Sequence, residues 1–159
     1  MRHAVRKIII SAGVVLAAAG TTGCSGGKAV QATATTATSG PTATTQSSAM
    51  AVTLNEYKIT ASRTTLAAGH YNFTITNHGA IPHELLVFHT DLAPAALPMK
   101  DGDVDEEGPG VNKVSDGDNV DPGASQTRDV DLSVPGSYLL VCNIAGHFHA
   151  GMVQAITVT

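Results

Sequence analysis

Alternating apolar and polar residues predict β-strands in the last two thirds of the chain. The segments 70–77 (HYNFTITN) and 127–134 (TRDVDLSV) both alternate with a period of two, which places their apolar side chains on one face of a strand. In the first segment these side chains are Tyr71, Phe73 and Ile75. In the second they are Val130, Leu132 and Val134.

Other apolar runs extend the pattern to a complete sandwich. The run at 84–90 (ELLVFHT) is nearly continuous, as expected of a central strand covered on both faces. Further strands are predicted at 51–59, 136–142 and 152–159, with Gly- and Pro-rich turns between them. The two prolines of 91–99 (DLAPAALPM) allow one short helical turn. We therefore predict an all-β fold, a Greek-key β-sandwich of about seven or eight strands, over residues 51–159.

The first residues have the pattern of an export signal. A basic start, MRHAVRK, precedes the apolar run IIISAGVVLAAAG, which is short for a membrane span. The following TTGC resembles the cleavage site of bacterial lipoproteins, which predicts a signal peptide over 1–23 and a lipid-carrying Cys24, although Thr21 departs from the usual Leu or Val. The alternative is ordinary cleavage after the small residues 17–19, which would give a secreted or periplasmic soluble protein.

Residues 24–50 are rich in Ala, Thr and Ser and lack a periodic apolar face. Such a segment buries too little apolar surface to offset chain entropy, so we predict a disordered tether with a reach of about 30 Å. The three predicted regions are therefore the signal peptide 1–23, the tether 24–50 and the folded domain 51–159.

The charge of the chain excludes one class of partner. Beyond Cys24 there are six Lys and Arg against thirteen Asp and Glu, a formal net charge of −7, and the chain has no Trp. Nucleic-acid binding requires the opposite sign, so no nucleic-acid partner is expected, and an acidic body favours a basic one.

Much of the acidity lies in a long insertion, 91–123. Its segment DGDVDEEG is similar to a calcium-binding loop, but Glu106 stands where the EF-hand loop needs glycine and Asn112 where it needs glutamate. We therefore interpret the acidic part, 101–121, as a solvated loop.

The segment 142–152, CNIAGHFHAGM, gathers ligands for a soft metal. Cys142 has no disulfide partner in the predicted domain, and four residues separate it from His147, as four separate His147 from Met152. Thiolate, imidazole and thioether together favour copper. A second histidine is needed, and the best candidate is His83, which follows Pro82 directly before a predicted central strand.

These two segments resemble the cupredoxin family, the plastocyanin- and azurin-like type I copper proteins. The resemblance covers most of 51–159 and implies one copper ion held by His83, Cys142, His147 and Met152. Each residue alone has an ordinary structural explanation, and His149 is an alternative ligand, although alternation suggests that it points away. Zinc could occupy the same ligands without being the native ion.

One departure from the family concerns the neighbours of the ligands. The family usually has Asn after the first His, whereas Glu84 follows His83 and Asn143 follows Cys142. We expect the Asn143 amide to bridge towards Glu84, and a carboxylate near the copper to favour Cu(II).

The resemblance implies a one-electron carrier outside the cytoplasm rather than an enzyme. His147 would be the port for electrons, within a patch formed by Ala80, Ile81, Pro82, Ile144, Ala145 and Phe148. Basic redox partner proteins and the membrane, reached through the lipid anchor, are the expected partners. Three alternatives remain: a copper trafficking or storage protein, a copper-enzyme subunit, and an adhesion-type sandwich without metal.

Overall fold

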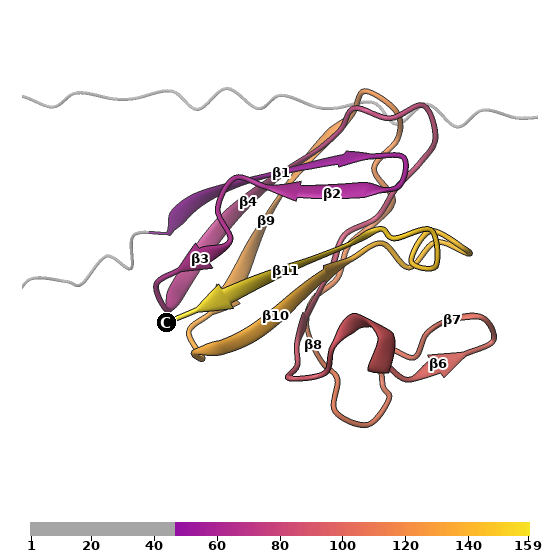
Figure 1. Ribbon diagram of the computed structural model, residues 1–159. Helices are drawn as coiled ribbons and strands as arrows, with labels where there is room; N and C mark the ends of the chain where they lie inside the picture. Colours follow the sequence, from indigo (N-terminus) through magenta and orange to yellow (C-terminus); the bar gives the residue numbers. More distant parts are fainter. Residues whose placement is uncertain (1–46) are drawn as a thin grey trace, which may run out of the picture. The chain divides into compact units, whose positions relative to one another are not determined.

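The computed structural model describes residues 47–159 (Figure 1). The predicted signal peptide, Cys24 and the tether up to residue 46 lie outside the described residues. Within 47–159 the regular elements are β-strands and one short 3-10 helix, so the predicted all-β fold is confirmed. No helix in this part of the chain is long and apolar enough to cross a membrane.

Four strands form the first sheet, in the order β2-β1-β4-β9. Strand β1 lies parallel to β4, and the other neighbours are antiparallel. Their exposed and buried residues alternate, because one face packs inward and the other meets solvent. The strands are β1 (Ser48–Asn55), β2 (Lys58–Ala61), β4 (Gly69–Asn77) and β9 (Ser125–Leu132).

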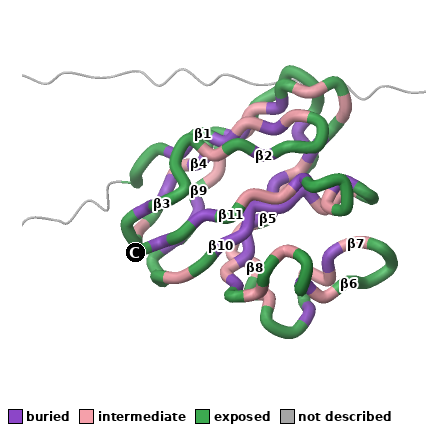
Figure 2. The backbone as a smooth tube through the Cα atoms, viewed as in Figure 1, coloured by how far each residue is buried: buried purple, intermediate pink, exposed green. Residues whose placement is uncertain are grey.

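Five strands form the second sheet, in the order β3-β11-β10-β5-β8. The central strands β5 and β10 contain continuous buried stretches, at residues 86–88 and 138–141, which are purple in Figure 2. The strands are β3 (Thr65–Leu66), β5 (Leu86–His89), β8 (Asn112–Ser115), β10 (Gly136–Val141) and β11 (Val153–Val158).

The apolar side chains form two clusters, one on each face of the second sheet. The inner core contains residues of both sheets: Met50, Val52, Leu54, Ile59, Leu66, Tyr71, Phe73, Ile75, Leu85, Val87, Val120, Val130, Leu132, Tyr138, Leu140, Cys142, Met152, Ile156 and Val158. The outer cluster contains Leu86, Phe88, Leu97, Val104, Leu139 and Val141. Successive residues of β5 and β10 alternate between the two clusters, as the period of a strand requires.

The insertion supplies the cover for the outer face. It contains the 3-10 helix η1 (Pro94–Ala96) and the hairpin of β6 (Met99–Lys100) and β7 (Asp103–Val104), which are drawn at the lower right of Figure 1. Leu97 and Val104 are buried in the outer cluster. The interpretation of 101–121 as a solvated loop is therefore wrong at Val104, which packs against the sheet together with Leu97.

Three strand boundaries differ from the prediction. The run 51–59 is two strands, since the chain turns at Glu56 and Tyr57, and β1 already begins at Ser48 inside the predicted tether. Val134 lies beyond β9 and is 54% exposed, so its placement with Val130 and Leu132 is wrong. Together with β3 and the insertion strands, these changes give eleven strands in 47–159.

Candidate metal centre

Three of the predicted ligands converge at one end of the sandwich. The Nδ1 atoms of His83 and His147 lie 3.2 Å apart, and Sγ of Cys142 lies 3.3 Å from Nδ1 of His147. One ligand atom from each of the three residues lies within 4.8 Å of the others, and all three side chains are buried. The cluster therefore presents a sulfur and two nitrogens to one small volume.

The strand period places the thiol of Cys142 inward. Tyr138 and Leu140 precede it at two-residue steps and share the inner core with it. Its backbone N–H donates to the carbonyl of Met152 at 3.1 Å, which continues the β10–β11 pairing beyond the last ladder pair. The thiol is thus positioned by a regular sheet up to its own residue.

His83 is held by backbone pairing and by a buried amide. Its N–H and C=O pair with Val120 at 3.2 and 2.6 Å, an isolated bridge outside the named strands. The side chain of Asn77 donates to the carbonyls of Val120 and Ile81, both at 2.8 Å. Because Asn77 is fully buried, these bonds fix the chain just before His83 and the residue that pairs with it across the bridge.

His147 and Met152 close the loop between β10 and β11. The N–H of His147 donates to the Ile144 carbonyl at 2.8 Å, and the N–H of Met152 donates to the His147 carbonyl at 3.1 Å. Met152 is fully buried in the inner core, at the same end as Cys142. The structure thus places Met152 beside the cluster through backbone contacts to both loop ligands.

His149 lies apart from the three converging residues. Its Nε2 is 3.0 Å from the carbonyl of Gly102 in the β6–β7 hairpin, and the residue is exposed. This contact joins the ligand loop to the insertion rather than to the cluster.

Burial shifts the acid–base properties of the ligands. Burial, together with the nearby His147, lowers the pKa of His83, so its imidazole stays neutral to lower pH. Burial raises the pKa of the Cys142 thiol, although N–H groups of Glu84 and Ile144 oppose the shift. Without an ion, burial therefore favours the neutral forms of His83 and Cys142.

Glu84 contacts both Cys142 and the residue after it. Its backbone N–H lies 3.4 Å from Sγ of Cys142, and its Oε1 accepts the backbone N–H of Asn143 at 2.8 Å. Burial raises the pKa of the Glu84 carboxyl, and the bond from Asn143 partly offsets this. The bridge between these two residues thus uses the backbone N–H of Asn143.

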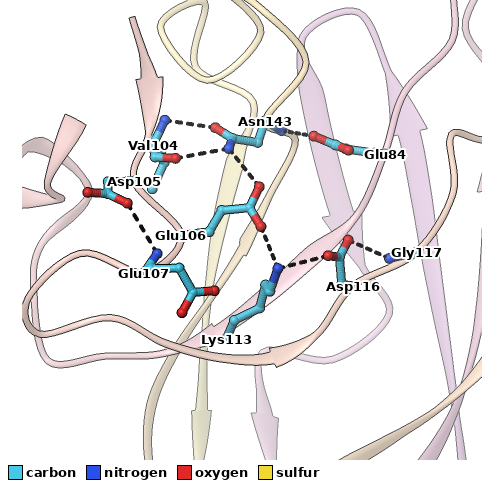
Figure 3. A network of polar contacts seen from close by, with 9 residues as sticks. All are labelled: Glu84, Val104, Asp105, Glu106, Glu107, Lys113, Asp116, Gly117 and Asn143. Atoms are coloured by element: carbon cyan, nitrogen blue, oxygen red, sulfur yellow. Dashed lines mark hydrogen bonds and ion pairs between the residues drawn. The ribbon is translucent and has the colours of Figure 1, made fainter. Parts of the chain in front are cut away.

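The side chain of Asn143 faces the insertion (Figure 3). Its Oδ1 accepts the N–H of Val104 at 2.8 Å, and its Nδ2 donates to the Val104 carbonyl at 3.0 Å and to Glu106 at 3.1 Å. Lys113 joins the same carboxylate of Glu106 to Asp116, at 2.7 and 2.9 Å. The residue next to the thiol is therefore fixed by the segment that also covers the outer cluster.

Two residues of the β1–β2 turn reach the imidazoles, and the sequence did not single them out. Oε1 of Glu56 lies 3.7 Å from Nε2 of His83, and the ring of Tyr57 meets that of His147 edge-on with 5.1 Å between centroids. Oε1 of Glu56 accepts the N–H groups of Ala80 and Ile81. Hydrogen bonds from three backbone N–H groups lower the pKa of the Glu56 carboxyl. The largest contribution comes from the N–H of Glu56 itself, followed by those of Ala80 and Ile81.

The donor set fits a metal ion of intermediate to soft character. Two nitrogens 3.2 Å apart can both reach an ion at bond lengths of about 2.0 Å, and one sulfur stands close to both. Sulfur combined with imidazole suits copper, zinc or iron rather than the hard cations calcium and magnesium. Each of the three buried residues would supply one ligand atom to such an ion.

Comparison with solved structures finds the same fold in auracyanins. A dithionite-reduced auracyanin from the photosynthetic bacterium Roseiflexus castenholzii matches at 18% identity, with a TM-score of 0.51, over 71% of this chain and 96% of its own. Auracyanin B matches at 20% identity, with a TM-score of 0.51, over 70% and 88%. Auracyanin A from Chloroflexus aurantiacus, described as a "blue" copper protein, matches at 15% identity, with a TM-score of 0.48, over 69% and 99%.

Sequence comparisons give no further assignment. No protein-family model matches the chain, and the search of curated proteins found no match. The structural likeness rests on the arrangement of strands, and the His–Cys–His cluster lies at one end of that arrangement. The domain therefore has the cupredoxin-like fold of the auracyanins, which confirms the resemblance inferred from the sequence.

Proposed function

We propose that the domain binds one copper ion and acts as a one-electron carrier. The observation that carries this proposal is the convergence of His83, Cys142 and His147 within 4.8 Å in a buried site. We assign Met152 as the fourth and weaker ligand, because it is buried and its N–H and C=O bond to the other two loop ligands. The combination of a thiolate with two imidazoles supports the choice of copper.

Bound copper would supply the one-electron couple, and the protein would hold its ligands still. The ligands come from a sheet strand, a bridged segment and a loop closed by hydrogen bonds, so little rearrangement is expected on electron gain or loss. Protein ligands that fill the site leave no position for a substrate, which favours a carrier over an enzyme. Within 47–159, one group of potential metal-binding His, Cys, Asp and Glu residues stands out.

We further propose His147 as the electron port. It is 7% exposed. Of the residues expected to form the patch, Ala80, Pro82 and Ala145 are exposed, and Ile81 and Ile144 are half-buried. Phe148 is half-buried against the outer cluster, so it contributes less to this surface than expected. Tyr57, 44% exposed, adds an aromatic edge beside the His147 ring.

The spectrum of the protein with added Cu(II) tests the site. We expect an intense thiolate-to-copper band in the visible region, which Cys142→Ser abolishes. His149→Ala is the matched control, because this histidine lies in the same loop but contacts Gly102. An unchanged band in Cys142→Ser, or its loss in His149→Ala, would contradict the ligand set.

A trafficking or storage function is the alternative, and exchange kinetics separate the two. Both sulfur ligands are fully buried, whereas rapid delivery of copper needs accessible ligands. We therefore expect slow transfer of Cu(I) to an added chelator and fast electron exchange with a small redox protein. Transfer of copper faster than electron exchange would favour trafficking.

Glu84 is proposed to tune the site through its bond to Asn143. An ionised carboxylate near the copper favours Cu(II), so Glu84→Gln should raise the reduction potential. A fall in the potential, or no change, would remove this role.

The remaining acidic residues are proposed to guide a basic redox partner. Glu106 and Asp116 are engaged with Lys113, which leaves exposed carboxylates such as Asp101, Glu107 and Asp118 for this role. Electron transfer from a basic donor should then slow with rising ionic strength. A flat salt profile would contradict the proposal.

We also propose export and membrane anchoring through Cys24. Two acyl chains on this residue would hold the protein at the membrane, since each buried methylene contributes about 0.8 kcal/mol. Cys24→Ser should move the protein from the membrane to the soluble fraction of cells. Equal amounts in the membrane fraction for both forms would favour a different mode of retention.

A further inference from the structure

The structure leaves one polar atom of the candidate centre without a partner. Nε2 of His83 is buried and makes no hydrogen bond to any described residue. The Nδ1 atom of the same ring faces His147 and Cys142. A buried donor without an acceptor is destabilising, so the groups around Nε2 influence where the ring carries its proton.

The carboxylate of Glu56 is the nearest charged group to that atom. Its Oε1 lies 3.7 Å from Nε2, longer than a hydrogen bond but within reach of a small side-chain movement. Within residues 47–159, Glu56 is the acidic residue whose carboxylate lies within 4.0 Å of the His83 ring nitrogens.

The position of the Glu56 carboxylate is itself fixed. Oε1 accepts the N–H of Ala80 at 2.5 Å and the N–H of Ile81 at 3.0 Å. Gly79 leaves the necessary space, because a Cβ at this position would lie 2.5 Å from Oε1. These contacts hold the carboxylate of Glu56, in the β1–β2 turn, close to the His83 ring.

We propose that Glu56 is a positioning residue for His83, keeping the proton on Nε2 and the lone pair of Nδ1 free for the metal. A neutral imidazole carries its proton on one nitrogen, and the partner of one nitrogen decides whether the other can bind a metal. The inference rests on the proposed copper site only for the use of Nδ1. The preference of the ring for one tautomer is a property of the metal-free chain.

The test measures the His83 ring in the metal-free chain by ¹⁵N NMR, and Cu(II) affinity by competition with a chelator. In the unmodified chain we expect the proton on Nε2. Glu56→Ala should increase the form protonated on Nδ1 and weaken Cu(II) binding about tenfold or more, as loss of a ligand's hydrogen-bond partner typically does.

Gly79→Ala displaces the carboxylate without removing it. The new methyl group meets the flexible end of the Glu56 side chain, so the fold is kept while Oε1 moves. We expect the same two changes as in Glu56→Ala. Glu56→Gln retains an acceptor oxygen, so it should preserve most of the tautomer preference.

Glu107→Gln is the control for charge, because it removes an exposed carboxylate of the insertion. Unchanged rings in both Glu56→Ala and Gly79→Ala would overturn the proposal. So would a change confined to Glu56→Ala, or a Glu56→Gln variant as impaired as Glu56→Ala. If the unmodified chain shows no thiolate-to-copper band, the proposed function fails, while the ¹⁵N measurement still decides the role of Glu56.

Discussion

The second sheet is apolar on both faces along β5 and β10, but the two faces are covered in different ways. Its inner face packs against the first sheet, whose own outer face meets solvent and alternates accordingly. Its outer face, with Leu86 and Phe88, packs against the insertion through Leu97 and Val104. The nearly continuous apolar sequence of β5 thus indicates that both of its faces are buried. The outer face is buried by the insertion, whose acidic composition had led us to predict a solvated loop.

The largest expected effect tests whether the two covers are equivalent. Phe88→Ala should lower the free energy of unfolding by about 3–5 kcal/mol, because Phe88 is fully buried and its removal leaves a cavity. Phe73→Ala, in the inner core, is the matched variant and should cost a similar amount. Urea unfolding of both variants gives the comparison. A cost for Phe88 below half of that for Phe73 would mean that the outer cover is loosely attached.

Leu97 tests the cover itself. It lies in the insertion and is 5% exposed, so Leu97→Ala should lower the free energy of unfolding by about 2–3 kcal/mol. Val134→Ala, at a position 54% exposed, is the control and should cost less than about 0.5 kcal/mol. Equal urea midpoints for the two variants would mean that Leu97 contributes no more to stability than an exposed residue, as in a solvated loop.

Asn143 tests the link between the insertion and the metal centre. Asn143→Ala removes the bonds to Val104 and Glu106 but keeps the backbone N–H that bonds to Glu84. We expect a loss of about 1–2 kcal/mol, because the Val104 N–H loses its acceptor, and a shifted thiolate-to-copper band.

The matched variant for this link is Asn72→Ala, whose side chain bonds Asp129 on the far sheet. It should leave the spectrum unchanged. A spectrum of Asn143→Ala identical to that of the unmodified protein would show that the insertion stabilises the sheet without influencing the centre.

The smallest expected effect concerns the ion pairs of the insertion. The bond from Lys113 lowers the pKa of Asp116 below its ordinary 3.8, so the folded state releases this proton more readily than the unfolded state. The resulting stability is present above pH 3.8 and is lost as the pH falls through the lower folded value. Because the side chain is 50% exposed, the contribution is below about 1 kcal/mol.

Asp116→Asn should therefore be less stable than the unmodified protein at pH 7, with the difference shrinking in acid. Asp118→Asn, at an exposed position of the same segment, serves as the control. Thermal unfolding across pH measures both. A difference for Asp116→Asn that grows in acid would contradict the assigned direction of the pKa shift.

The sequence predicted those parts of the molecule that depend on local periodicity. Alternation located β4 and β9, and apolar runs between turns located β10 and β11. The inward phase of β10 follows from Tyr138 and Leu140 up to Cys142. The approach of His83 to the ligand loop came from the family resemblance, since 58 positions separate Glu84 from its contact at Cys142.

The contributions of Glu56 and of the insertion could not be read in this way. The turn at Glu56 and Tyr57 lies inside an apolar run that has the pattern of one strand, and its contact with the imidazoles depends on how the sheets are stacked. In the insertion, Leu97 and Val104 stand isolated among prolines, glycines and acids, so no period marks them as buried.

The pairing of β1 has a mechanical consequence. This strand lies between β2 and β4, and its first residue, Ser48, already pairs with Tyr71. A force applied to the chain ahead of Ser48, along the strand, first loads the ladder with β4 in shear, and from Val52 onward the ladder with β2 adds to it. A domain pulled from this end should therefore resist stretching better than one whose first strand hangs at a sheet edge and can be peeled away bond by bond.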